Sequence, residues 1–144
     1  MLALTAIDHP DVIDTQTVRL PAGAPDDPAW WATRIFSSRR TPGAVAALLG
    51  LRQLLVPLIG VRPATSARSV FAVERVVGSE ALIVNRDRHL DFACSVTVDR
   101  SAGLLSLTTV VQLHGWRGRV YWLPVGLLHG PVTRSMLRRA VGDS

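Results

Sequence analysis

The sequence predicts an α+β fold in which an antiparallel, curved β-sheet wraps around a long C-terminal α-helix, with two helices after the first strand. Four successive runs between residues 69 and 114 have the alternation of strands, and the links between them are too short for anything but antiparallel neighbours. The next run, residues 116–140, returns to the apolar spacing of a helix. A helix that follows a one-sided sheet is expected to lie across its apolar face.

Length and composition set the class of protein. The 144 residues are expected to form one domain, 1–144, and 48% hydrophobic residues are enough to build a core. The formal net charge is +5 and every basic residue is arginine, but the arginines are scattered, so we expect no nucleic-acid partner. The single cysteine, Cys94, excludes an internal disulfide and fits a cytoplasmic protein. The N-terminus lacks the basic region and apolar core of a secretory signal.

The first strand is predicted within residues 14–20, because Pro21 and Gly23 terminate it. One side of it carries Thr15, Thr17 and Arg19, and the other carries Gln16, Val18 and Leu20. A short helix is predicted next, because Asp26 or Asp27 can cap it and Pro28 suits its first turn. The apolar face of this helix is expected to contain Trp30, Trp31, Ile35 and Phe36.

The longest apolar run, residues 41–61, is long enough to be tested as a membrane span. Arg52 lies near its middle, and an arginine at the centre of a bilayer costs several kcal/mol. The helical spacing of its apolar residues instead predicts a buried helix that begins after Thr41 and kinks at Pro57. We therefore expect no transmembrane span, although contact with a membrane surface stays open because the run is so apolar.

The strands of the meander have distinguishable faces. In the third strand Leu90, Phe92, Cys94, Val96 and Val98 share one face, and Asp91, Ala93, Ser95, Thr97 and Asp99 share the other. In the fourth, Leu105, Leu107, Thr109, Val111 and Leu113 share a face. Since both faces are only half polar, one is expected to turn towards an interior. In the helix that follows, Pro124 and Pro131 are predicted to kink or divide it, and Arg138 and Arg139 suit its C-terminus.

Several motifs resemble a known bacterial family. They are "DRHLDF" (Asp87–Phe92), "TTVVQLHGWRGRVYW" (Thr108–Trp122) and "HGPVTRSMLRRA" (His129–Ala140), supported by "LPAGAP" near the N-terminus and "GLRQLLVPLIG" in the long apolar run. Together they are similar to the family catalogued as domain of unknown function 2867, and the element order resembles the START-like, polyketide-cyclase-like (helix-grip, SRPBCC) superfamily. One departure is Gly115, where Asn is expected after the histidine. The family has no assigned activity, so the resemblance implies the fold and, from helix-grip relatives, an apolar ligand between the sheet and the long helix.

The charged stretch before the third strand offers one candidate site. His89 and Asp91 share a face, so that the carboxylate can orient the imidazole. If Leu90, Phe92 and Cys94 face the core, His89 and Asp91 face away and form a solvated ion pair near a hairpin end. One alternative is a polar cluster on the concave side of the sheet. Another is a catalytic dyad, but no nucleophile lies next to it, because Cys94 is on the opposite face of the strand.

Other candidates lie at the last strand and the C-terminal helix. His114 is expected to link strand and helix, and Arg117 to form an ion pair with Asp87, Asp91 or Glu80 or else to meet an anionic ligand group. The full set of candidate ligand-binding residues is His89, Asp91, Phe92, Leu107, Val111, His114, Trp116, Arg117, Tyr121 and His129. The histidines lack the spacing of a metal site, so we predict no metal and no cofactor.

These observations favour a small-molecule binding protein with an apolar cavity between the meander and the C-terminal helix, taking an apolar or amphipathic ligand. Its walls or core are expected to include Leu90, Phe92, Cys94, Leu107, Val111, Tyr121, Leu128 and Met136. One alternative is a cyclase-like or hydrolytic enzyme in which His89 is the base and Asp91 orients it. Another is a module that associates with itself through residues 43–60, so the protein is expected to be a monomer or a homodimer.

Overall fold

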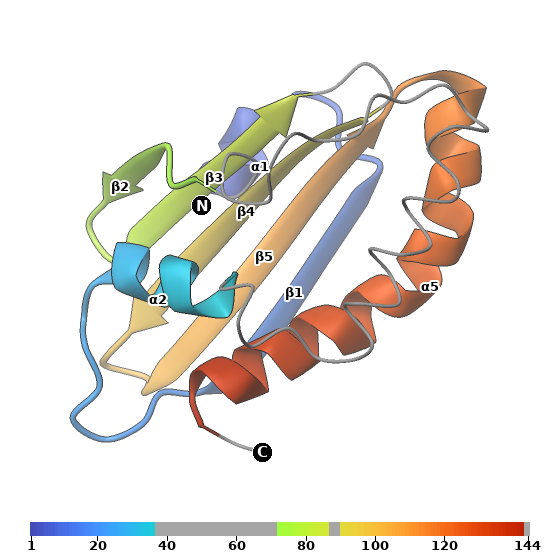
Figure 1. Cartoon of the computed structure of the whole chain (residues 1–144). Helices are drawn as coiled ribbons and strands as arrows, with labels where there is room; N and C mark the ends of the chain where they lie inside the picture. The colour runs from blue at the N-terminus through green and yellow to red at the C-terminus, as the bar shows by residue number, and fades with distance from the viewer. Residues whose placement is uncertain (37–71, 87–89, 143–144) are drawn as a thin grey trace.

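The centre of the molecule is a five-stranded antiparallel sheet in the order β1-β5-β4-β3-β2 (Figure 1). The computed structural model describes residues 1–36, 72–86 and 90–142. The strands are β1 (Val12–Arg19), β2 (Arg75–Val77), β3 (Glu80–Arg86), β4 (Leu90–Asp99) and β5 (Leu104–Leu113). Strands β2 to β5 pair in succession, which confirms the predicted meander, and β1 joins it by pairing with β5. The run expected as the first meander strand forms a ladder only from Arg75, and its residues up to 71 lie outside the described part.

The hairpins explain why the meander forms. Val77 pairs with Glu80 across the two residues Gly78 and Ser79, as the sequence predicts. Gly78 has φ 59, the left-handed value that a type II′ turn requires at its first central position. Such a turn has the twist of the strands it joins, so β2 and β3 are forced to be antiparallel neighbours.

Two helices lie on one face of the sheet. Helix α2 (Pro28–Ile35) begins as predicted, with Asp27, rather than Asp26, accepting a hydrogen bond from the amide of Ala29 at 2.9 Å. Helix α5 (Gly115–Ala140) is a single helix that includes Pro124 and Pro131. The two prolines do not divide α5, which bends along its length instead (Figure 1).

The start of α5 accounts for the departure at Gly115. This residue has φ 68, in the left-handed region. It directly follows His114, which occupies the N-cap position of α5 without a side-chain capping hydrogen bond. Glycine and asparagine are the residues that adopt this conformation with least strain. The substitution of Gly for the Asn expected at this position therefore preserves the backbone turn that joins β5 to α5.

A short helix that the sequence analysis did not predict, α1 (Leu2–Ala6), lies on the opposite face of the sheet (Figure 1). Its first amides are bonded by side chains from the strands: Leu2 N–H donates to Glu80 Oε1 at 2.6 Å and Ala3 N–H to Ser95 Oγ at 2.8 Å. A five-residue helix is too short to be stable by itself, so these long-range bonds hold it.

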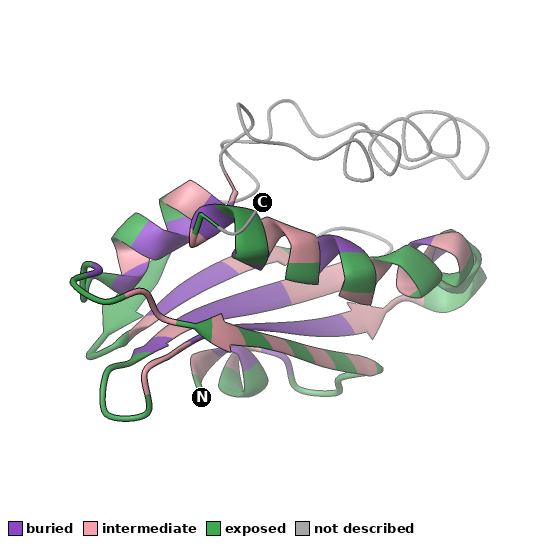
Figure 2. Ribbon diagram, turned by 90° about the horizontal axis from the view of Figure 1, so that it is seen from below, coloured by how far each residue is buried: buried purple, intermediate pink, exposed green. Residues whose placement is uncertain are grey.

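The main core lies between the sheet and helices α2 and α5 (Figure 2). We call the sheet face towards these helices the inner face, and the face that carries α1 the outer face. Trp31, Leu107 and Leu137 are buried in the main core, and the indole N–H of Trp31 donates to the carbonyl of Pro25. A smaller cluster beneath α1 contains Ala3, Ile7, Leu82, Ala93 and Val110. The architecture fits the predicted helix-grip arrangement, with the α2–α5 layer covering one side of a curved sheet.

Two expected core positions are exposed. Trp30 is 42% exposed, because it lies one helical position away from the buried Trp31. Leu128 is 43% exposed, because it lies beside the residues that turn towards the sheet, such as Val125 and Val132. The sequence placed Trp30 on the apolar face of its helix and Leu128 among the wall or core residues. Neither is buried, since helical spacing alone does not fix where a buried face ends.

The predicted apolar helix within residues 41–61, with its proposed roles in self-association or contact with a membrane, lies outside the described residues. Among the helices that the structure describes, none is long and apolar enough to cross a membrane.

Candidate functional site

The inner side of β1 carries two polar residues in an otherwise apolar row. The strand alternates in burial along its length, with Val12, Asp14, Gln16 and Val18 turned inward. Register confirms the face, because Asp14 is opposite Thr109 and Gln16 is opposite the buried Leu107 of β5. A carboxylate and a carboxamide therefore lie on the side of the sheet that α5 covers.

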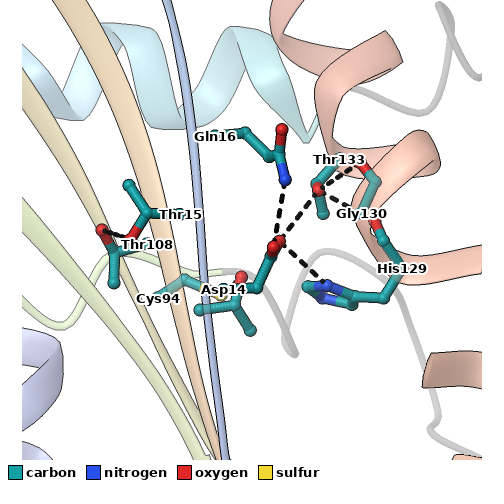
Figure 3. A network of polar contacts seen from close by, with 9 residues as sticks. Asp14, Thr15, Gln16, Cys94, Thr108, His129, Gly130 and Thr133 are labelled. Atoms are coloured by element: carbon teal, nitrogen blue, oxygen red, sulfur yellow. Dashed lines mark hydrogen bonds and ion pairs between the residues drawn. The ribbon is translucent and has the colours of Figure 1, made fainter. Parts of the chain in front are cut away.

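Helix α5 crosses β1 close to these side chains (Figure 3). Gly130 lies at the crossing: a Cβ atom there would be 3.6 Å from Gln16 Nε2 and 4.0 Å from Asp14 Oδ1. The neighbouring residues His129 and Thr133 point their side chains towards Asp14. The edge strand β1 and the C-terminal helix α5 thus bring together residues from both ends of the chain.

Asp14 is the centre of this cluster, which we call the Asp14–His129 site. Its Oδ1 accepts a hydrogen bond from Gln16 Nε2 at 3.0 Å, and its Oδ2 lies 3.3 Å from His129 Nδ1 and 3.4 Å from Thr133 Oγ1. The Thr133 hydroxyl is also 2.8 Å from the carbonyl oxygen of His129 and 3.0 Å from that of Gly130. A hydroxyl has one proton to donate, and the shortest of the three distances favours the helix carbonyl.

The imidazole of His129 is largely buried, with 17% of its side chain exposed. Burial lowers its pKa below the usual value, and the neighbouring carboxylate of Asp14 partly opposes that shift. The ring is therefore neutral at pH 7. Its Nδ1 is buried and forms no well-aligned hydrogen bond with any described residue, although Asp14 is within ion-pair distance. The nearest polar partner of Nδ1 among the described residues is therefore the carboxylate of Asp14.

Trp122 forms an apolar wall of the site. Its ring centroid is 5.5 Å from that of His129, and the two rings are tilted by 44°. Gly126 makes this placement possible, since a Cβ atom there would be 2.8 Å from the indole Nε1. The glycine thus leaves room for the indole to lie along the helix surface and reach the imidazole.

Cys94 lies on the inner face of β4, opposite Thr109 of β5. Its sulfur is 3.7 Å from Thr109 Oγ1, and burial raises the pKa of the thiol to about 12. A thiol with this pKa is protonated at neutral pH and is a poor nucleophile. Cys94 therefore contributes packing next to the site.

The pair predicted from the charged stretch lies elsewhere. Asp91 is on the outer face of β4, as expected if Leu90, Phe92 and Cys94 face the core. Its Oδ2 lies 3.1 Å from His114 Nε2, with 18% of the Asp91 side chain exposed. His89 lies outside the described residues, so its predicted partnership with Asp91 stays a prediction.

The remaining predicted site residues divide between the core and the surface. Phe92, Leu107 and Val111 are on the inner face, with Leu107 and Val111 buried. Trp116 is 67% exposed, and the guanidinium carbon of Arg117 lies 5.3 Å from its ring. Tyr121 is part of α5, but its side chain lies outside the described part of the structure.

Of the predicted residues, the structure brings His129 into a polar cluster on the inner face. Sequence reasoning missed its partners Asp14, Gln16 and Thr133. A signal for the first two was present in the sequence, because strand periodicity places them on the same side of β1 as the apolar residues Val12 and Val18. Over the described ranges, no three His, Cys, Asp or Glu side chains are grouped so that they could hold a metal ion.

Comparison with known proteins adds the family. No curated protein and no solved structure matches the chain. The family model described as "Protein of unknown function (DUF2867)" matches residues 6–136, a range that contains every residue of the Asp14–His129 site. The chain therefore belongs to this family.

Proposed function

We propose that this protein binds a small apolar or amphipathic molecule between the inner face of the sheet and α5, and that the Asp14–His129 site holds the polar end of that molecule. The observation that carries the proposal is a polar pair on the apolar inner face: the largely buried imidazole of His129 lies 3.3 Å from the carboxylate of Asp14. Binding sites typically combine an apolar lining with a few convergent polar groups.

The surroundings of the site support an amphipathic ligand. Trp122 contacts the imidazole, and Val111 continues the apolar inner face in the neighbouring strand. Phe92 and Met136 are only partly buried and pack against the main core, so they offer apolar surface on the same side of the sheet. Polar and apolar contacts would thus be available to one molecule. This is the ligand position expected for the START-like, SRPBCC superfamily, whose membership we propose on the same basis.

Binding is favoured over catalysis by the contacts of the site. The pairing of Asp14 with His129 is the arrangement of a base and its orienting carboxylate. A nucleophile must lie within hydrogen-bond reach of that base, but the hydroxyl of Thr133 is closest to helix carbonyls. The described residues therefore support a ligand site more strongly than a hydrolytic one. The enzyme alternative based on His89 and Asp91 would need a pocket on the outer face.

The test is binding of the neutral, environment-sensitive dye Nile red to the purified protein. We expect saturable binding to the wild type and weaker binding to the His129→Gln variant. The matched control is His114→Gln, which removes an imidazole that lies 3.1 Å from a carboxylate on the outer side of the sheet. Organic extraction of the native protein followed by mass spectrometry then identifies any molecule that co-purifies. Absence of saturable binding, or equal loss in both variants, would contradict the proposal.

A further inference from the structure

We propose that the polar end of the ligand is a hydrogen-bond donor, a hydroxyl or an ammonium group, and that the site discriminates against carboxylates. This inference rests on the proposed function and specifies the ligand class for the same site. This preference is the opposite of what the net charge predicts, because a protein with a formal net charge of +5 is expected to attract anions.

The first argument comes from the balance of donors and acceptors. A carboxylate offers about four lone-pair positions, and Asp14 receives one hydrogen bond of good length, from Gln16. The proton of Thr133 is shared with two nearer helix carbonyls. Acceptor capacity at Asp14 is therefore left over, and a donor on the ligand can use it.

The imidazole adds a second acceptor. Since Nδ1 faces the carboxylate, the proton of a neutral ring is best placed on Nδ1, and Nε2 then carries a lone pair. No described residue has a hydrogen bond to Nε2. A ligand hydroxyl or ammonium can donate to either acceptor, whereas a ligand carboxylate can donate to neither.

The charges point the same way. The side chain of Asp14 is 25% exposed, and burial favours the neutral form of the neighbouring His129 ring, which brings no positive charge to the site. The arginines of α5 are on the exposed surface of the helix: Arg117, Arg119, Arg134, Arg138 and Arg139. Among the described residues, the polar contacts of the Asp14 side chain are with Gln16, His129 and Thr133. A carboxylate placed here would meet a like charge in a partly buried site, where solvent screens the repulsion weakly.

The experiment compares three probes with the same alkyl chain: n-decanol, decylammonium and decanoate. Isothermal titration calorimetry at neutral pH measures their dissociation constants for the full-length protein. We expect n-decanol and decylammonium to bind at least about tenfold more tightly than decanoate, a difference of about 1.4 kcal/mol. In Asp14→Asn the preference should fall to less than about threefold, since the charge is removed with little change in shape. Asp91→Asn is the matched control, because it removes a carboxylate beside a histidine on the outer face and should keep the wild-type preference.

The outcomes separate the two proposals. If decanoate binds the wild type as tightly as n-decanol, or if Asp91→Asn abolishes the preference as fully as Asp14→Asn, the donor-ligand inference is wrong and the proposed function stands. If no probe binds the wild type, the proposed function fails and the inference fails with it. The ranking in the wild type decides the inference even where Asp14→Asn does not fold.

Discussion

Replacing His129 with Gln tests the electrostatic account of the site through the pH dependence of stability. Burial lowers the pKa of His129 in the folded protein, with Asp14 opposing the shift. The ordinary value, about 6.5, applies to the unfolded chain. Between the folded and unfolded pKa values the unfolded state binds more protons. The contribution of the neutral imidazole is therefore fully present above about pH 6.5 and is lost as the pH falls towards the folded pKa.

The size of the effect follows from the single proton involved. Within that window, the contribution of His129 to the free energy of unfolding can change by at most about 1.4 kcal/mol per pH unit. Above the window this contribution does not change with pH. His129 is suited to this measurement because 17% of its side chain is exposed, so solvent screens the effect little. The variant His129→Gln has no proton to bind at this position. The free energy of unfolding of the wild type minus that of the variant should therefore rise with pH up to about pH 6.5 and then stay level.

The assay is urea denaturation of both proteins at a series of pH values, with a parallel NMR titration of the imidazole. Asp14→Asn provides a second arm, because it removes the group that opposes the effect of burial. The titration midpoint of His129 should move to still lower pH in that variant. A stability difference that decreases as the pH rises, or a midpoint that moves up in Asp14→Asn, would refute this account of the site.

Three further predictions follow from the packing. Gly126→Ala should shift the indole N–H resonance of Trp122, because the new Cβ would lie 2.8 Å from that nitrogen. Gly130→Ala is the control and should leave the resonance in place. Equal shifts in both variants would show that Trp122 does not lie this close to Gly126. Cys94 should react with a thiol reagent only after denaturant is added, because it is buried and its pKa is raised to about 12; rapid reaction of the native protein would contradict this. Ser95→Ala should lower the free energy of unfolding by about 1–2 kcal/mol, since a buried helix amide loses its acceptor, and an unchanged urea midpoint would show that α1 is not held by this bond.

The strand pattern of the meander could be read from the sequence in detail. Alternation placed Leu90, Phe92 and Cys94 on the face that meets the helices, and it placed Asp91 on the opposite face. The turn at Gly78 could also be predicted, because local conformational preferences decide it. In contrast, α1 has five residues and is held by hydrogen bonds to β3 and β4, so no local pattern predicts it.

The sequence by itself determined the α+β class, the antiparallel order of the meander and the long C-terminal helix, because periodicity and turn chemistry are local properties. It also marked His129 as a candidate, but it offered no partner for it. Only the tertiary structure decided that partner: β1 pairs with β5 at the edge of the sheet, and α5 crosses it at Gly130. These contacts place Asp14 against His129 and Thr133, the last of which is 119 positions away along the chain. Pairing over such separations depends on how whole elements pack, and no local pattern encodes it.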